Sequence, residues 1–119
     1  MLKKSSSSVR IYYPKFDREW LIRRLKERLG ALEVKLPLQL VVLFGSYAKG
    51  NYTVASDIDL LIVYKGQERK DAFAIVKKTF SVPRLEPHVY SEGRYEGLKG
   101  IISKMIENGI VLFSKDGPD

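Results

Sequence analysis

Two segments decide the fold: residues 40–50, LVVLFGSYAKG, and residues 56–63, SDIDLLIV. Each contains an unbroken apolar run, Leu40 to Phe44 and Leu60 to Val63, of the length expected for a buried strand. Gly45-Ser46 ends the first run in a turn of small residues, where backbone and hydroxyl groups can approach a ligand closely. The centre of the chain therefore predicts two buried strands with polar groups at their ends.

Two aspartates lie where the second strand begins. Because side chains alternate along a strand, Asp57 and Asp59 point to the same face, about 7 Å apart along the chain. Two carboxylates this close repel each other, and burying them costs free energy unless a cation compensates or one of them is protonated. Mg²⁺ prefers oxygen ligands and commonly binds through one or two carboxylates, phosphates and water. The pair is therefore a candidate magnesium site.

From the length and composition we expect a single domain, and the residue types present restrict its chemistry. The 119 residues fit a single core, and a hydrophobic content of 45% is ordinary for a globular protein. No apolar run is long enough to span a membrane and no signal peptide is recognisable, so we expect a cytoplasmic protein with no membrane partner. The chain has no cysteine and one histidine, His88, which disfavours disulfides, thiolate catalysis, histidine metal sites and a Ser-His triad. Carboxylates are the remaining catalytic groups.

The charge of the chain indicates polyanionic partners. A net charge of +7 suits a nucleotide, a nucleic acid or an acidic protein surface. Much of the excess lies between Arg18 and Arg28, where Glu19 and Glu27 alternate with basic residues as on a solvated helix face. We therefore favour a solvated surface over a dedicated nucleic-acid interface.

The remaining pattern predicts a mixed α+β order. Asp17 is a candidate N-cap of a helix that ends near Leu29 and Gly30. The other expected elements are helices over Gln67–Phe80 and from Tyr95 to Gly109, and strands over Arg84–Tyr90 and Ile110–Phe113. The absence of a regular βαβ repeat favours a two-layer sandwich, with helices packed on one side of a small mixed sheet.

The domain boundaries follow from the same pattern. We assign residues 14–115 to the single domain, residues 1–13 to an N-terminal arm that is flexible or pairs as an edge strand, and residues 116–119 to a tail. Tyr12, Tyr13 and Trp20 near the arm suggest an association surface, which leaves a homo-oligomer open, although core packing explains Trp20 as well.

Gly45-Ser46, ten intervening residues and then Asp57-Ile58-Asp59 resemble the signature of the polymerase-beta-like nucleotidyltransferase superfamily. The order of elements on both sides is similar to that of its small stand-alone members, the minimal nucleotidyltransferases (MNT type). The resemblance implies that Ser46 and the neighbouring backbone amides hold nucleotide phosphates. The predicted nucleotide-binding residues are Gly45, Ser46, Lys49 and Ser56, of which Lys49 could equally be a solvent-facing residue. It also implies two Mg²⁺ ions, or Mn²⁺, held by both aspartates and a third carboxylate from a later strand.

Glu86 matches the position of that third carboxylate. The predicted catalytic and metal-binding residues are therefore Asp57, Asp59 and Glu86. Glutamate stands here where aspartate is common, and Pro87 beside it removes a ladder hydrogen bond, which is tolerated only at a sheet edge or bulge. The competing interpretation of Glu86 is an ordinary surface residue. His88 lies on the same strand face by period-two counting, but we assign it no chemistry.

A P-loop is the obvious competitor, because four residues separate Gly45 and Gly50. It is excluded by the next two positions. Asn51 stands where the phosphate-binding lysine is required, and Tyr52 stands where the magnesium-binding hydroxyl residue is required.

The resemblance implies transfer of a nucleoside monophosphate, AMP from ATP in the favoured case, to an acceptor hydroxyl with release of pyrophosphate. Minimal nucleotidyltransferases are typically paired with a helical HEPN-type toxin, which they neutralise as antitoxins by adding AMP to a tyrosine. We therefore expect ATP and a helical partner protein. The alternatives are a catalytically degenerate nucleotide- or partner-binding module, and a basic nucleic-acid-binding domain that uses Arg10, Tyr12, Tyr13, Arg23 and Arg24.

Overall fold

The computed structural model describes residues 17–53 and 55–115, and the expected N-terminal arm and C-terminal tail lie outside these ranges. The elements follow in the order α1 (Arg18–Lys35), β1 (Leu38–Phe44), α2 (Ser46–Lys49), β2 (Ile58–Tyr64), α3 (Ala72–Phe80), β3 (Leu85–Ser91), α4 (Glu92–Gly97), α5 (Lys99–Met105) and β4 (Ile110–Ser114). Among these described helices, none combines the length and apolar character that crossing a membrane requires.

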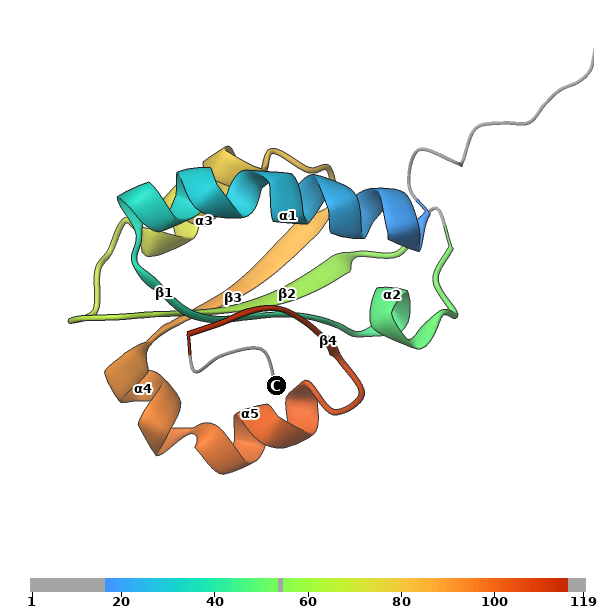
Figure 1. The fold of residues 1–119 in the computed structure, drawn as a ribbon. Coiled ribbons are helices and arrows are strands. Elements are labelled where there is room, and N and C mark those ends of the chain that lie inside the picture. Colours follow the sequence, from blue (N-terminus) through green and yellow to red (C-terminus); the bar gives the residue numbers. More distant parts are fainter. Residues whose placement is uncertain (1–16, 54, 116–119) are drawn as a thin grey trace, which may run out of the picture.

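The strands form one mixed sheet in the order β3-β2-β1-β4. Strand β1 is antiparallel to β2 and β4, whereas β2 is parallel to β3. The carboxyl end of β1 therefore meets the amino ends of β2 and β3 at one end of the sheet, where α2 also lies (Figure 1). At this end Phe44 pairs with Asp59, and Asp59 pairs with Glu86. The register thus places two of the three predicted carboxylates on neighbouring strands.

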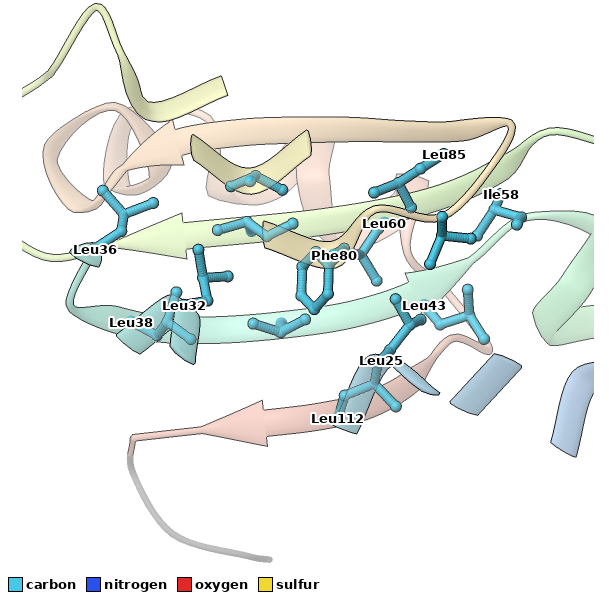
Figure 2. Close-up of a cluster of buried hydrophobic side chains, with 14 of the residues drawn as sticks. Leu25, Leu32, Leu36, Leu38, Leu43, Ile58, Leu60, Phe80, Leu85 and Leu112 are labelled. Carbon is cyan, nitrogen blue, oxygen red and sulfur yellow. The ribbon is translucent and has the colours of Figure 1, made fainter. Parts of the chain in front are cut away.

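Helices α1 and α3 cover one face of the sheet (Figure 1). Figure 2 shows Leu25 and Leu32 of α1 and Phe80 of α3 over Leu43 and Leu60 of the sheet. All five side chains are fully buried. Because apolar burial is the main favourable term in folding, this layer fixes the position of β1 and β2.

Helices α4 and α5 cover the opposite face (Figure 1). A second buried cluster on this side joins Ile102 of α5 to Val42, Phe44, Leu61 and Val63 of the two central strands. The mixed α+β fold is confirmed, but helices lie on both faces of the sheet and not only on the one expected. The unbroken apolar runs in β1 and β2 explain this difference, since strands buried on both faces do not alternate with polar residues.

Helix α1 is longer than predicted, because it passes through Gly30 and ends at Lys35. Asp17 caps its start as expected, with its carboxylate accepting a hydrogen bond from the Trp20 N–H at 2.8 Å. Leu32 and the C-cap residue Leu36 are fully buried. Glycine in an exposed helix costs about 1 kcal/mol, whereas burying one leucine gains about 1.5–3 kcal/mol. The apolar stripe therefore continues the helix past the glycine.

The helix predicted over Gln67–Phe80 begins only at Ala72. The preceding loop is held by Arg69, whose N–H donates to the Tyr64 hydroxyl at 2.8 Å and whose guanidinium pairs with Asp71 at 2.9 Å. These contacts hold the loop in a non-helical conformation.

The last predicted helix is in fact two short helices, α4 and α5. They meet at Leu98, whose φ of −113° and ψ of 11° are not helical. Ser91 caps α4 through its hydroxyl, which accepts a hydrogen bond from the Arg94 N–H at 3.3 Å. The break lets each helix follow the sheet surface separately.

Candidate functional site

In the turn after β1, the backbone lies close to the carboxylate of Asp59. Gly45 has φ 79° and ψ −154°, in a region that side chains of L-residues rarely allow. A β-carbon at this position would overlap the Asp59 carboxylate, with Oδ2 as its nearest atom. Glycine is therefore required both by the backbone conformation and by the close approach to Asp59.

Helix α2 follows this turn and is held by α1. The Arg18 guanidinium donates to the carbonyls of Ala48 at 2.7 Å and Tyr47 at 3.4 Å, which lie in the last turn of α2. The Arg18 N–H donates to the Tyr52 hydroxyl at 3.0 Å. The rings of Tyr47 and Tyr52 stack at 4.2 Å between centroids. Arg18 and Tyr52 were not predicted as site residues, but they fix the orientation of the turn.

Tyr47 is buried within this arrangement. Its side chain is 2% exposed. Burial raises the pKa of the Tyr47 phenol above its ordinary value, the neighbouring Tyr52 adds to the increase, and the positive charge of Arg84 opposes it. The hydroxyl therefore stays neutral at physiological pH, and Tyr47 serves as a packing residue beneath the turn.

The predicted carboxylates gather at the same end of the sheet. Asp57 lies just before β2 with 58% of its side chain exposed, and Asp59 lies in β2 with 30% exposed. Glu86 is exposed on β3, opposite Asp59 in the parallel register, so both side chains leave the same face of the sheet. The register therefore places Glu86 beside Asp59, while its role as a metal ligand stays a prediction.

Each aspartate contacts a basic side chain. The Asp57 Oδ1 atom lies 3.9 Å from Nη2 of Arg84, and the Asp59 Oδ1 atom lies 3.4 Å from Nε2 of His88. The His88 ring also packs on Phe44, with 5.1 Å between centroids. Arg84 and His88 were missed as site residues. The only sequence signal for His88 was its period-two spacing from Glu86.

Lys49 and Ser56 occupy different surroundings. Lys49 is exposed in the last turn of α2. The Ser56 hydroxyl accepts a hydrogen bond from the Thr53 N–H at 2.9 Å and lies 3.4 Å from the Thr53 hydroxyl, so it closes its own loop. Nucleotide contacts by these two residues stay predictions.

The donor set suits a hard cation. All three carboxylates offer oxygen ligands, which Mg²⁺ prefers, and the glycine at position 45 keeps the backbone close to Asp59 without a side chain between them. Within the described ranges, no three acidic or histidine side chains converge tightly enough to hold a metal ion. The carboxylates would have to turn from Arg84 and His88 toward a shared centre.

Sequence comparison identifies relatives of this chain. The profile of the nucleotidyltransferase domain family matches residues 18–112. A candidate protein adenylyltransferase of Methanocaldococcus jannaschii is 49% identical over 43 residues, which make up 34% of this chain and 43% of that protein. The match thus spans less than half of that relative.

Solved structures share the fold. A candidate nucleotidyltransferase from Sulfolobus solfataricus superposes with a TM-score of 0.56 at 23% identity, covering 83% of this chain and 85% of the other. A chain from the complex of a tri-AMPylated Shewanella oneidensis HEPN toxin with an MNT antitoxin gives a TM-score of 0.54 at 18% identity, covering 83% and 74%. At these identities the likeness extends to the fold.

Proposed function

The chain belongs to the nucleotidyltransferase domain family, and from this premise we propose that it transfers AMP from ATP to a hydroxyl group of a partner protein. The observation that carries the proposal is the contact between the Gly45 turn and Asp59, with Glu86 opposite Asp59 in the register. This arrangement puts a turn suited to phosphates beside carboxylates suited to a cation. The donor and the acceptor are inferred from relatives.

The turn would bind the triphosphate. Gly45 and Ser46 offer backbone N–H groups and a hydroxyl at the start of α2, where free N–H groups favour an anion. Lys49 is exposed on the same short helix and could add a positive charge. The hydrogen bonds from Arg18 to the last turn of α2 would keep these groups in place while the nucleotide binds.

The carboxylates Asp57, Asp59 and Glu86 would hold Mg²⁺. When bound, the metal would neutralise charge on the phosphates and lower the pKa of the attacking hydroxyl. In the described structure Arg84 and His88 are the neighbours of the two aspartates, and the side chains of Asp57 and Asp59 would have to turn away from them to reach a shared metal ion. A partner or the nucleotide itself could supply the free energy for that movement.

The relatives suggest the acceptor. The matched segment of the Methanocaldococcus protein points to protein adenylylation, and the Shewanella complex contains a toxin that carries AMP groups. We therefore propose a HEPN-type helical protein as the partner and one of its tyrosines as the acceptor, with this chain acting as its antitoxin.

A catalytically degenerate binding module is the second candidate. Two observations favour it: both aspartates already have basic neighbours, and the three carboxylates do not converge among the described residues. Such a module would neutralise its partner by stoichiometric association. It would bind the partner but transfer nothing.

Labelled ATP separates the two candidates. The chain is incubated with Mg²⁺ and a purified HEPN-type protein, using ATP labelled in the α-phosphate or, in parallel, in the γ-phosphate. We expect label on a partner tyrosine only from α-labelled ATP, and none with Asp57→Asn. Asp71→Asn is the matched control, because Asp71 is an exposed aspartate paired with Arg69 on the loop before α3. Association without labelling would support the binding module, and labelling from the γ-phosphate would contradict AMP transfer.

A further inference from the structure

Arg84 lies where β2 and β3 begin, immediately before the first residue of β3. Its backbone adopts φ 65°, which is uncommon for a residue other than glycine. Such a conformation is strained and persists only where the surrounding contacts enforce it. The contacts that Arg84 makes are therefore informative.

The Arg84 side chain binds the segment that carries Asp57. Its Nε donates to the Ser56 carbonyl at 3.3 Å, and its Nη2 donates to the Ala55 carbonyl. The same Nη2 lies 3.9 Å from the Asp57 carboxylate. One guanidinium thus holds two successive carbonyls and faces the carboxylate that follows them.

The Arg84 backbone holds the other side of Asp57. Its carbonyl accepts a hydrogen bond from the Ile58 N–H at 2.9 Å. Asp57 is therefore flanked on both sides by contacts to a single residue of the neighbouring strand. A planar guanidinium is suited to this task, because its fork of N–H donors has a fixed geometry that lysine lacks.

We propose that Arg84 is a positioning residue that fixes residues 55–57 and so presents Asp57 at the catalytic end of the sheet. This inference rests on the proposed transferase function. In this role Arg84 would act through Asp57 and not on the reacting atoms themselves. Loss of the guanidinium would release the segment, while the sheet and both helical layers stay intact, because the Arg84 side chain is 49% exposed and lies outside the core.

Three substitutions separate the contributions of Arg84. Arg84→Gln removes the charge and the fork, and Arg84→Lys keeps the charge alone. Arg84→Gly also removes the side chain, but glycine adopts a positive φ without strain, so this variant tests whether backbone strain contributes to the effect. Arg69→Gln is the matched control. Arg69 likewise donates to a carbonyl, that of Lys35 at 3.2 Å, and pairs with an aspartate, but it follows the carboxyl end of β2 at the opposite end of the sheet.

The first readout is amide hydrogen exchange in the protein without nucleotide. In Arg84→Gln we expect the amides of residues 55–58 to exchange about tenfold faster, because two hydrogen bonds that close the segment are lost. We expect the same increase in Arg84→Gly and unchanged exchange there in Arg69→Gln. Unchanged exchange at residues 55–58 in Arg84→Gln would overturn the proposal.

The second readout is the kinetics of AMP transfer. We expect kcat to fall about a hundredfold in Arg84→Gln, because a small displacement of a catalytic group is costly. The KM for ATP should stay within about twofold of the wild type, since the ground-state contacts of the nucleotide are kept. Arg84→Lys should recover little of the loss. A raised KM with unchanged kcat, or full activity in Arg84→Lys, would overturn the positioning role.

The two readouts distinguish the failure of this inference from the failure of the proposed function. A wild-type protein that transfers no AMP under any condition would refute the transferase activity. The exchange measurement would still decide whether Arg84 holds residues 55–57, because it needs no substrate.

Discussion

The backbone of Gly45 runs so close to Asp59 that a β-carbon on Gly45 would overlap the Oδ2 atom of that carboxylate. Strands β1 and β2 are antiparallel neighbours, and Phe44 pairs with Asp59 in their register. The turn that ends one strand therefore touches the carboxylate that opens the other. This contact joins the predicted phosphate-binding turn to the predicted metal ligands.

Substitution of Gly45 should distort the turn and displace the Asp59 carboxylate. In Gly45→Ala the new methyl group must displace Asp59, and the backbone at φ 79° and ψ −154°, a region essentially confined to glycine, adds about 1–3 kcal/mol of strain. We expect a lower melting temperature and loss of nucleotide binding. Gly30→Ala is the control, because its β-carbon would meet nothing within 4 Å, and alanine in a helix should stabilise by about 0.5–1 kcal/mol. Wild-type melting in Gly45→Ala would contradict the geometry of the turn.

Removing either aspartate should stop the chemistry without unfolding the protein. Asp57→Asn and Asp59→Asn keep the size of each side chain and remove one of two repelling charges. If these groups hold the metal, transfer should fall by at least about a thousandfold, since metal ions supply several kcal/mol of charge stabilisation. Thermal unfolding should show a melting temperature close to that of the wild type, because the lost repulsion offsets the lost contacts with Arg84 and His88. Retained transfer in both variants would refute the metal assignment.

The extension of α1 beyond Gly30 can be tested by its buried leucine. Leu32 is fully buried, whereas Val34 two residues later is 86% exposed. Leu32→Ala should lower the free energy of unfolding by about 2–5 kcal/mol because it leaves a cavity. Val34→Ala should change it by less than about 0.5 kcal/mol, as for an exposed site. Chemical denaturation measures both, and equal effects would show that the helix does not pack past Gly30.

The burial of Tyr47 predicts a loss of stability in alkali. Its pKa is raised above the ordinary value of 10.0, mainly by burial, so the folded state favours the neutral phenol. The stabilising effect is complete below pH 10.0 and is lost as the pH rises toward the higher pKa of the folded state. Denaturation between neutral and strongly alkaline pH should show a shallower decline in Tyr47→Phe. Parallel curves for the two proteins would contradict this account.

The parts of the fold that the sequence predicts are those set by local signals. Unbroken apolar runs predicted β1 and β2. The family was indicated by the small-residue turn at Gly45 together with its spacing to Asp57 and Asp59. The register places Glu86 opposite Asp59, and its role as the third metal ligand stays a prediction.

The parts that escaped prediction depend on tertiary contacts. The local preference of Gly30 predicts the end of a helix there, but the burial of Leu32 and Leu36 overrides that preference. Arg84 and His88 belong to no recognised motif, and they contact the aspartates because β2 and β3 pair in parallel. Pairing between distant strands is not visible in single-sequence periodicity.

The most direct test of the central claim is calorimetric titration of ATP, with and without Mg²⁺, into the wild-type protein and into Asp59→Asn. The account predicts binding to the wild type that depends on Mg²⁺ and is lost in Asp59→Asn, with a melting temperature that shows the variant still folded. Equal binding of ATP to both proteins, or binding that ignores Mg²⁺, would contradict a nucleotide site built on the carboxylates beside Gly45.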